Sequence, residues 1–158
     1  MSRHARIITA LLFITTAFSL SSFANQAADI EVSISNVRSQ QGSVLVSVFN
    51  DKDTKAFPEG VEKAVVKLKL TVAQSEKFII ENLPAGEYAI AVLHDEDDNG
   101  QMNKAGFPIK IPKEGFGFSN NKMKTFGPPS FEMSKVTVAA PVTQVSIRMK
   151  HMKGLSVK

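Results

Sequence analysis

Hydrophobic and polar residues alternate along most of the chain with a period of two. The pattern is clearest at 29–37, where Ile30, Val32 and Ile34 are separated by single polar residues. This alternation is typical of a β-strand that buries one face and exposes the other. It predicts about seven strands, at 29–37, 44–48, 64–70, 78–82, 88–94, 136–138 and 142–149.

A tight corner precedes the fifth of these strands and has the sequence Leu83-Pro84-Ala85-Gly86-Glu87-Tyr88. Proline presets φ and glycine permits a positive φ, so the segment is a turn. It is similar to the tyrosine corner of immunoglobulin-like sandwiches, in which a phenol ties down the crossover. We therefore expect Tyr88, the only tyrosine, to anchor the core. Short strands separated by turns predict an all-β fold, an antiparallel β-sandwich that is immunoglobulin-like or prealbumin-like.

The alternation is interrupted between residues 95 and 134. This segment, which we call the insert, is rich in glycine, proline and phenylalanine and shows no evident strand or helix. Connections of this length are rare in compact domains and are usually functional or disordered. Because disordered segments are poor in aromatic residues, we expect one long ordered loop folded over an end of the sandwich, where binding loops commonly lie.

The first 24 residues have the pattern of a signal peptide. Arg3 and Arg6 precede an apolar run at 7–20, and Ser22-Phe23-Ala24 offers small residues for cleavage. The run is short for a hydrocarbon layer about 30 Å thick, so we expect cleavage after Ala24 and no membrane span after signal removal. The predicted protein is exported, either periplasmic or secreted. Its predicted organisation is a signal peptide at 1–24, one domain at 25–150 and a flexible basic tail at 151–158.

The charge of the chain argues against nucleic acid as a partner. Nineteen lysines and arginines face fifteen acids, a formal net charge of +4, and loss of Arg3 and Arg6 with the signal leaves about +2. This charge is small and the lysines are scattered, whereas nucleic-acid sites gather basic residues on one face. The chain has no cysteine, so an apolar core must stabilise the domain without disulfides.

The acidic turn at the start of the insert is a candidate metal site. Asp95, Asp97 and Asn99 are spaced by two residues and Gly100 follows, which matches the first half of a calcium-binding loop. Calcium takes six to eight hard oxygens, and a tight turn brings alternate side chains to a common centre. In this pattern Gln101 would supply a backbone carbonyl, and Asn103 would bind directly or through water.

The second half of the calcium pattern is missing. Gly106 stands where a bidentate glutamate is expected, although Glu114 could complete the coordination shell from further along the chain. The alternative is a solvated acidic turn in which asparagine and glycine serve only the geometry. Calcium is the only cofactor that the sequence suggests.

His94 is a candidate for ligand binding. Zinc sites use three or four histidines, cysteines or carboxylates, whereas only His94 and His151 remain after signal removal. A triad with Asp95 is disfavoured, because neighbours on a strand point to opposite faces. We expect a structural imidazole that hydrogen-bonds to the insert. The alternative is a secreted hydrolase-type enzyme that uses His94 and nearby carboxylates.

The aromatic part of the insert adds further ligand-binding candidates: Glu114, Phe116, Phe118, Asn120 and Asn121. Phenylalanines flanked by amides suit a stacked sugar or an apolar peptide, but such rings also pack beneath long loops. We expect a non-catalytic binding or structural module whose partner is a small molecule, a glycan or an envelope protein.

Several segments of the chain resemble the DUF2141 family of exported bacterial proteins of unknown function. The resemblance rests on His94-Asp95 with the Asn99-Gly100 turn and on three longer motifs: Gly106-Phe107-Pro108, Pro112-Lys113-Glu114-Gly115-Phe116-Gly117-Phe118-Ser119-Asn120-Asn121 and Gly127-Pro128-Pro129-Ser130-Phe131. It covers about residues 30–149. Members often carry an aspartate or asparagine three residues after the turn, where this chain has Asn103. The resemblance implies the fold and the compartment, and it implies no activity. The corner at 83–88 is also similar to prealbumin-like modules such as the regulatory domains of carboxypeptidases.

Overall fold

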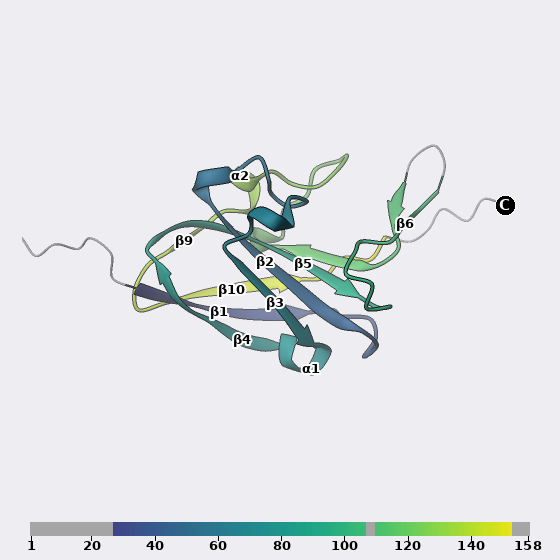
Figure 1. Ribbon diagram of the computed structural model, residues 1–158, viewed down its shortest axis with the longest axis horizontal. Helices are drawn as coiled ribbons and strands as arrows, with labels where there is room; N and C mark the ends of the chain where they lie inside the picture. Colours follow the sequence, from purple (N-terminus) through teal and green to yellow (C-terminus); the bar gives the residue numbers. More distant parts are fainter. Residues whose placement is uncertain (1–26, 107–109, 153–158) are drawn as a thin grey trace, which may run out of the picture.

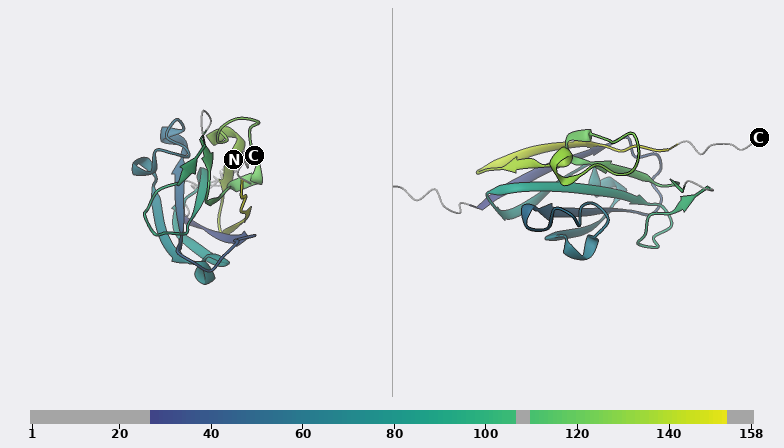
Figure 2. Two further views of the ribbon diagram at one scale, coloured as in Figure 1. Left: turned by 90° about the vertical axis from the view of Figure 1, so that its right-hand side faces the viewer. Right: turned by 90° about the horizontal axis from the view of Figure 1, so that it is seen from above.

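The structure is a computed structural model that describes residues 27–106 and 110–152. Two β-sheets pack face to face, and their strands run roughly along the long axis of the molecule (Figures 1 and 2). The prediction of an all-β sandwich is confirmed. The predicted signal peptide lies outside the described residues, as do 107–109 of the insert and 153–158 of the predicted tail. Within the described ranges, every helix is too short or too polar to cross a membrane.

The first sheet has the strand order β10-β1-β4. Its strands are β1 (Ala27–Ser35), β4 (Lys77–Pro84) and β10 (Val142–Arg148). β1 is antiparallel to β4 but parallel to β10, so the prediction of a wholly antiparallel sandwich is wrong for this pair. A hairpin turn forces neighbouring strands to be antiparallel, whereas strands from the two ends of the chain are free of that constraint.

The second sheet has the order β3-β2-β5-β8, with β9 also paired to β5. Its strands are β2 (Ser43–Asn50), β3 (Val66–Thr71), β5 (Gly86–Asp95), β8 (Gly115–Phe118) and β9 (Val136–Val138). β2 and β5 lie in the middle of the sheet because both of their faces are largely apolar.

Four connections carry the chain from one sheet to the other, and two of them have a clear local device. The short helix α1 (Val72–Ser75) links β3 to β4 and begins with a capping box between Thr71 and Gln74. The corner at Pro84 links β4 to β5, and there the Tyr88 hydroxyl donates a hydrogen bond of 2.9 Å to the Pro84 carbonyl. Tyr88 is buried in the main core. It therefore anchors the crossover as its sequence context predicted.

The domain has two apolar clusters, one on each face of the second sheet. The main core lies between the sheets and gathers the inward residues of β1, β2, β5 and β10. A second core lies on the opposite face and consists of six buried residues: Phe49, Phe57, Ala89, Phe116, Phe118 and Phe131. The rings of Phe49 and Phe57 meet edge to face at 5.4 Å. The β2–β3 loop, which contains the 3-10 turns η1 (Asp51–Asp53) and η2 (Val61–Lys63), covers this face through Phe57, and α2 (Phe131–Ser134) covers it through Phe131.

The insert contains regular structure that its sequence did not predict. It holds the small hairpin of β6 (Lys104–Ala105) and β7 (Ile111–Pro112), then β8, then the turn η3 (Ser119–Asn121). The prediction of an insert without strands is therefore wrong, above all at 115–118. All four residues of β8 are buried, so glycine alternates with phenylalanine instead of polar with apolar. A Cβ on Gly117 would lie 2.7 Å from Ile147 Cγ2, which shows how closely β8 approaches the first sheet.

Candidate metal centre

Strand pairing brings the start of the insert next to its middle. β5 and β8 are antiparallel, and their last pair is His94 with Gly115. One step further along the same register, Asp95 stands opposite Glu114. The turn that follows β5 adds Asp97, and one carboxylate oxygen from each of the three residues lies within 4.8 Å of the others. Asp95 is 0% exposed and Glu114 3%, so two of these three carboxylates are buried.

Asp95 organises the acidic turn from inside. One carboxylate oxygen accepts a hydrogen bond of 3.1 Å from the Asn99 N–H, and the other accepts one of 2.8 Å from the Gly100 N–H. The φ of Gly100 is +76°, a left-handed conformation that glycine adopts without strain. The turn therefore folds around a buried carboxylate.

Asp97, Asn99 and Asn103 form a network on the exposed side of the turn. Both amide side chains donate to the same oxygen of Asp97, Asn103 at 2.8 Å and Asn99 at 3.0 Å. These hydrogen bonds, above all that from Asn103, hold the pKa of Asp97 below its ordinary value. Gln101 joins through its backbone, whose N–H donates to the Asn99 side chain at 2.7 Å. All five residues of the predicted metal site thus take part in one hydrogen-bonded turn.

Glu114 joins this turn to the second half of the insert. One carboxylate oxygen accepts a hydrogen bond of 3.0 Å from the Glu96 N–H, and the other accepts one of 2.8 Å from the Asn103 N–H. The backbone of Lys113 adds a hydrogen bond of 2.8 Å to the Asn103 carbonyl. The calcium pattern lacks a glutamate at Gly106. Glu114, a buried glutamate directly before β8, is therefore the residue that could replace it.

A pH dependence follows from the exposed acids of this turn. The Ser43 hydroxyl and Lys69 lower the pKa of Asp98 from 3.8, as Asn103 lowers that of Asp97. A carboxylate with a lowered pKa stabilises the fold above its unfolded value and loses this effect as the pH falls through the folded value. We expect the free energy of unfolding, measured with urea, to fall between about pH 5 and about pH 3. The Asp98→Asn variant should show a smaller decrease, and an equal decrease would contradict the assignment.

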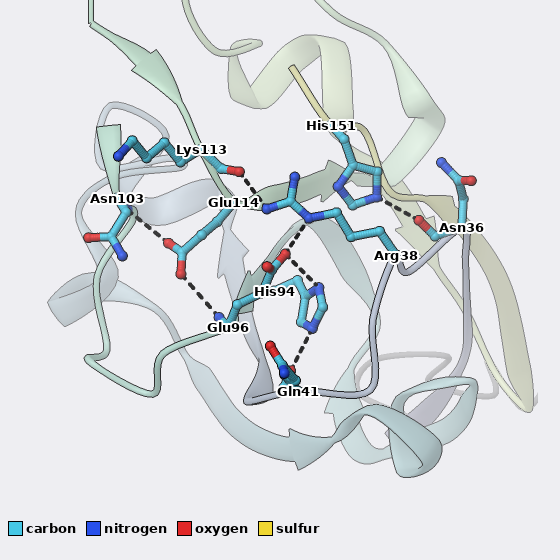
Figure 3. Close-up of polar contacts among 9 residues, drawn as sticks. All are labelled: Asn36, Arg38, Gln41, His94, Glu96, Asn103, Lys113, Glu114 and His151. Carbon is cyan, nitrogen blue, oxygen red and sulfur yellow. Dashed lines mark hydrogen bonds and ion pairs between the residues drawn. The ribbon is translucent and has the colours of Figure 1, made fainter. Parts of the chain in front are cut away.

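His94 lies behind the turn and is completely buried. Its Nε2 lies 2.9 Å from the Gln41 carbonyl oxygen, so this nitrogen carries a proton and donates it (Figure 3). Its Nδ1 lies 3.5 Å from a carboxylate oxygen of Glu96. The predicted hydrogen-bonded imidazole exists, but its partner belongs to the β1–β2 connection and not to the insert. A side chain without exposed surface is poorly placed to meet a substrate.

Arg38 links the same end of the sandwich from the β1–β2 connection. Its Nε donates to the Glu96 carboxylate at 2.6 Å, and its Nη2 donates to the Lys113 carbonyl at 2.7 Å (Figure 3). It therefore contacts the insert at its start and near its middle. Arg38 was not predicted as a site residue, because only the fold brings it near residues 58 to 75 positions away.

The remaining ligand-binding candidates hold the insert in place. Phe116 and Phe118 are 6% and 7% exposed and belong to the second core, so their rings offer little surface to a ligand. Asn120 donates to the Lys135 carbonyl at 2.7 Å. The Asn121 side chain donates to the Ser146 carbonyl at 2.9 Å and accepts from the Arg148 N–H at 2.7 Å. These four side chains lie apart from the acidic turn.

The family relationship of the chain is established by a family model. The model described as "Uncharacterized protein conserved in bacteria (DUF2141)" matches residues 32–146. This match spans both sheets from β1 to β10 and includes the acidic turn, Glu114 and the whole insert. No curated protein and no solved structure matches the chain. The resemblance seen in the sequence motifs is confirmed, and the chain belongs to the DUF2141 family of bacterial proteins.

Proposed function

We propose that the protein is an exported, non-catalytic β-sandwich module that binds a calcium ion between the start and the middle of its insert. One observation carries the proposal: the carboxylates of Asp95, Asp97 and Glu114 converge within 4.8 Å, and two of them are buried. A buried carboxylate destabilises the folded state unless a cation or several hydrogen bonds compensate its charge. The signal-peptide pattern of residues 1–24 supports export.

The chemistry of the donor groups suits calcium. All three acids offer hard oxygen atoms, and the amide oxygens of Asn99 and Asn103 lie in the same hydrogen-bonded network. Rotation of the two amides would turn their oxygens toward the ion. The Gln101 carbonyl and water would complete six to eight oxygen ligands. Zinc favours histidine and cysteine, whereas no histidine or cysteine belongs to this cluster in the described part of the chain.

The ion would act by fixing the insert. Asp95 ends β5, Asn103 directly precedes the β6–β7 hairpin and Glu114 lies between this hairpin and β8, so one cation would hold all three points against one another. β6 lies at the same end of the molecule as the end of β5 (Figure 1). A calcium ion there would order a binding surface for a small molecule, a glycan or an envelope protein. The full burial of His94 supports binding in preference to hydrolysis.

Thermal melts with calcium and with chelator test the proposal. A ligand of the native state at a hundred times its dissociation constant adds about 2.7 kcal/mol to the free energy of unfolding, so calcium should raise the Tm clearly. The Asp97→Ala variant should lose this shift. Asp53→Ala, which removes an exposed acid of η1, is the matched control and should retain it. An unchanged Tm in the parent protein, or a shift that survives Asp97→Ala, would contradict the calcium site.

A further inference from the structure

One loop of the insert holds an aromatic ring out in solvent. The Phe126 side chain is 84% exposed, the highest value for a large apolar residue in ranges 27–106 and 110–152. The other exposed large apolar side chains there lie between 44% and 53%. Single exposed apolar residues need no explanation, but a phenylalanine exposed to this degree forfeits more hydrophobic stabilisation than its partly covered counterparts.

The exposure of Phe126 is a property of an anchored loop. Three residues before it, Met123 packs against the second core, and five residues after it Phe131 is only 2% exposed. Between these anchors Gly127 has a φ of +74° and Pro128-Pro129 follows. Proline restricts the backbone at two positions. Figure 1 shows the loop before α2 extending away from the sandwich. The loop is thus fixed at both ends and presents Phe126 between them.

Lysines share a groove with this exposed ring. A groove of about 490 Å³ beside the loop is lined by Phe126, Pro128, Lys124 and Lys55. Two short segments, 51–55 and 122–124, contribute four exposed lysines against two aspartates, and no ion pair engages these lysines within the described residues. The acid that also lines the groove, Glu132, is paired with Lys135 at 3.1 Å.

We propose that this face docks on a membrane surface rich in anionic phospholipid. The Phe126 ring enters the headgroup region, and Lys52, Lys55, Lys122 and Lys124 contact lipid phosphates. A projecting aromatic residue with adjacent lysines combines the two terms that hold proteins at such interfaces, buried apolar area and attraction to anionic headgroups. The proposal is independent of calcium.

Vesicle flotation tests this proposal. The protein beginning at Asn25 retains every described strand and helix and lacks the apolar run of the signal. It is mixed with vesicles of phosphatidylglycerol and phosphatidylcholine, or of phosphatidylcholine alone. Chelator is present throughout, so that calcium cannot bridge protein and lipid. We expect binding to the anionic vesicles only, and a decrease with added salt because exposed charges are screened.

Three variants identify the docking residues. Phe126→Ser should weaken binding about tenfold, since the ring loses its apolar environment. The double variant Lys122→Gln, Lys124→Gln should weaken binding at least about tenfold. Ile79→Ser, which removes another exposed apolar side chain on β4, should leave binding unchanged. Absence of binding to anionic vesicles, equal binding to neutral vesicles, or an equal loss with Ile79→Ser would overturn the proposal.

Discussion

The Gly42→Ala variant should lose about 4 kcal/mol of unfolding free energy, through left-handed backbone strain and steric overlap together. Gly42 has a φ of +69°, and a Cβ there would overlap the backbone carbonyl oxygen of Asp95 and lie 2.7 Å from the Glu96 Cα. Both obstacles are backbone atoms, so no side-chain rotation can relieve the contact. The β1–β2 connection and the end of β5 would have to separate, which would also displace the acidic turn.

Urea denaturation of Gly42→Ala and Gly127→Ala separates the two contributions. Gly127 has a similar φ of +74°, but a Cβ there meets no described atom within 4 Å. Gly127→Ala should therefore lose only the backbone term, about 1 kcal/mol. Equal losses in the two variants would show that the contact between Gly42 and Asp95 contributes nothing.

The Glu114→Ala variant should lose about 3 kcal/mol of unfolding free energy in chelator, because the change leaves the N–H groups of Glu96 and Asn103 without an acceptor. A buried donor without an acceptor is destabilising by roughly 1–3 kcal/mol, and bonds to a charged acceptor are the stronger ones. The loss in chelator measures the structural role of Glu114 alone. Any calcium contribution would appear as a further difference when calcium is added.

Two further variants serve as comparisons for Glu114→Ala. Glu114→Gln keeps one acceptor oxygen and should lose about half as much. Glu132→Ala removes an acid whose side chain is 70% exposed and paired with Lys135, and should lose less than about 1 kcal/mol. If urea denaturation gave equal losses for Glu114→Ala and Glu132→Ala, Glu114 would not be the link between the two halves of the insert.

The sequence predicted the strands whose two faces differ in polarity. β1 places Ile30, Val32 and Ile34 inward and leaves polar residues outward, so its alternation was visible. β8 was missed because it lies between two apolar clusters and all its residues are buried. Its signal was an alternation of size, with glycines where the first sheet comes close and phenylalanines toward the second core.

The candidate site was predictable only where its residues are close in sequence. Asp95, Asp97 and Asn99 belong to one turn, and local spacing was enough to single them out. The link to Glu114 depends on the register of β5 with β8. Arg38 belongs to the β1–β2 connection, which is far from the insert in sequence. A single sequence has no local pattern that encodes such pairings, so long-range contacts of this kind require the fold.

The parallel pairing of β1 with β10 bears on when the domain can fold. Ser33 on β1 bonds to Ser146 on β10, 113 residues later, so the first strand made lacks one neighbour until almost the whole chain has been synthesised. Distant pairings of this kind form slowly, because the intervening chain must lose conformational entropy before the contacts between the two strands can stabilise it. We therefore expect the nascent chain to leave the ribosome before the domain is complete. In the export that we propose, an unfinished domain is the form that a narrow channel would accept, and folding would be completed only after the last strand had crossed.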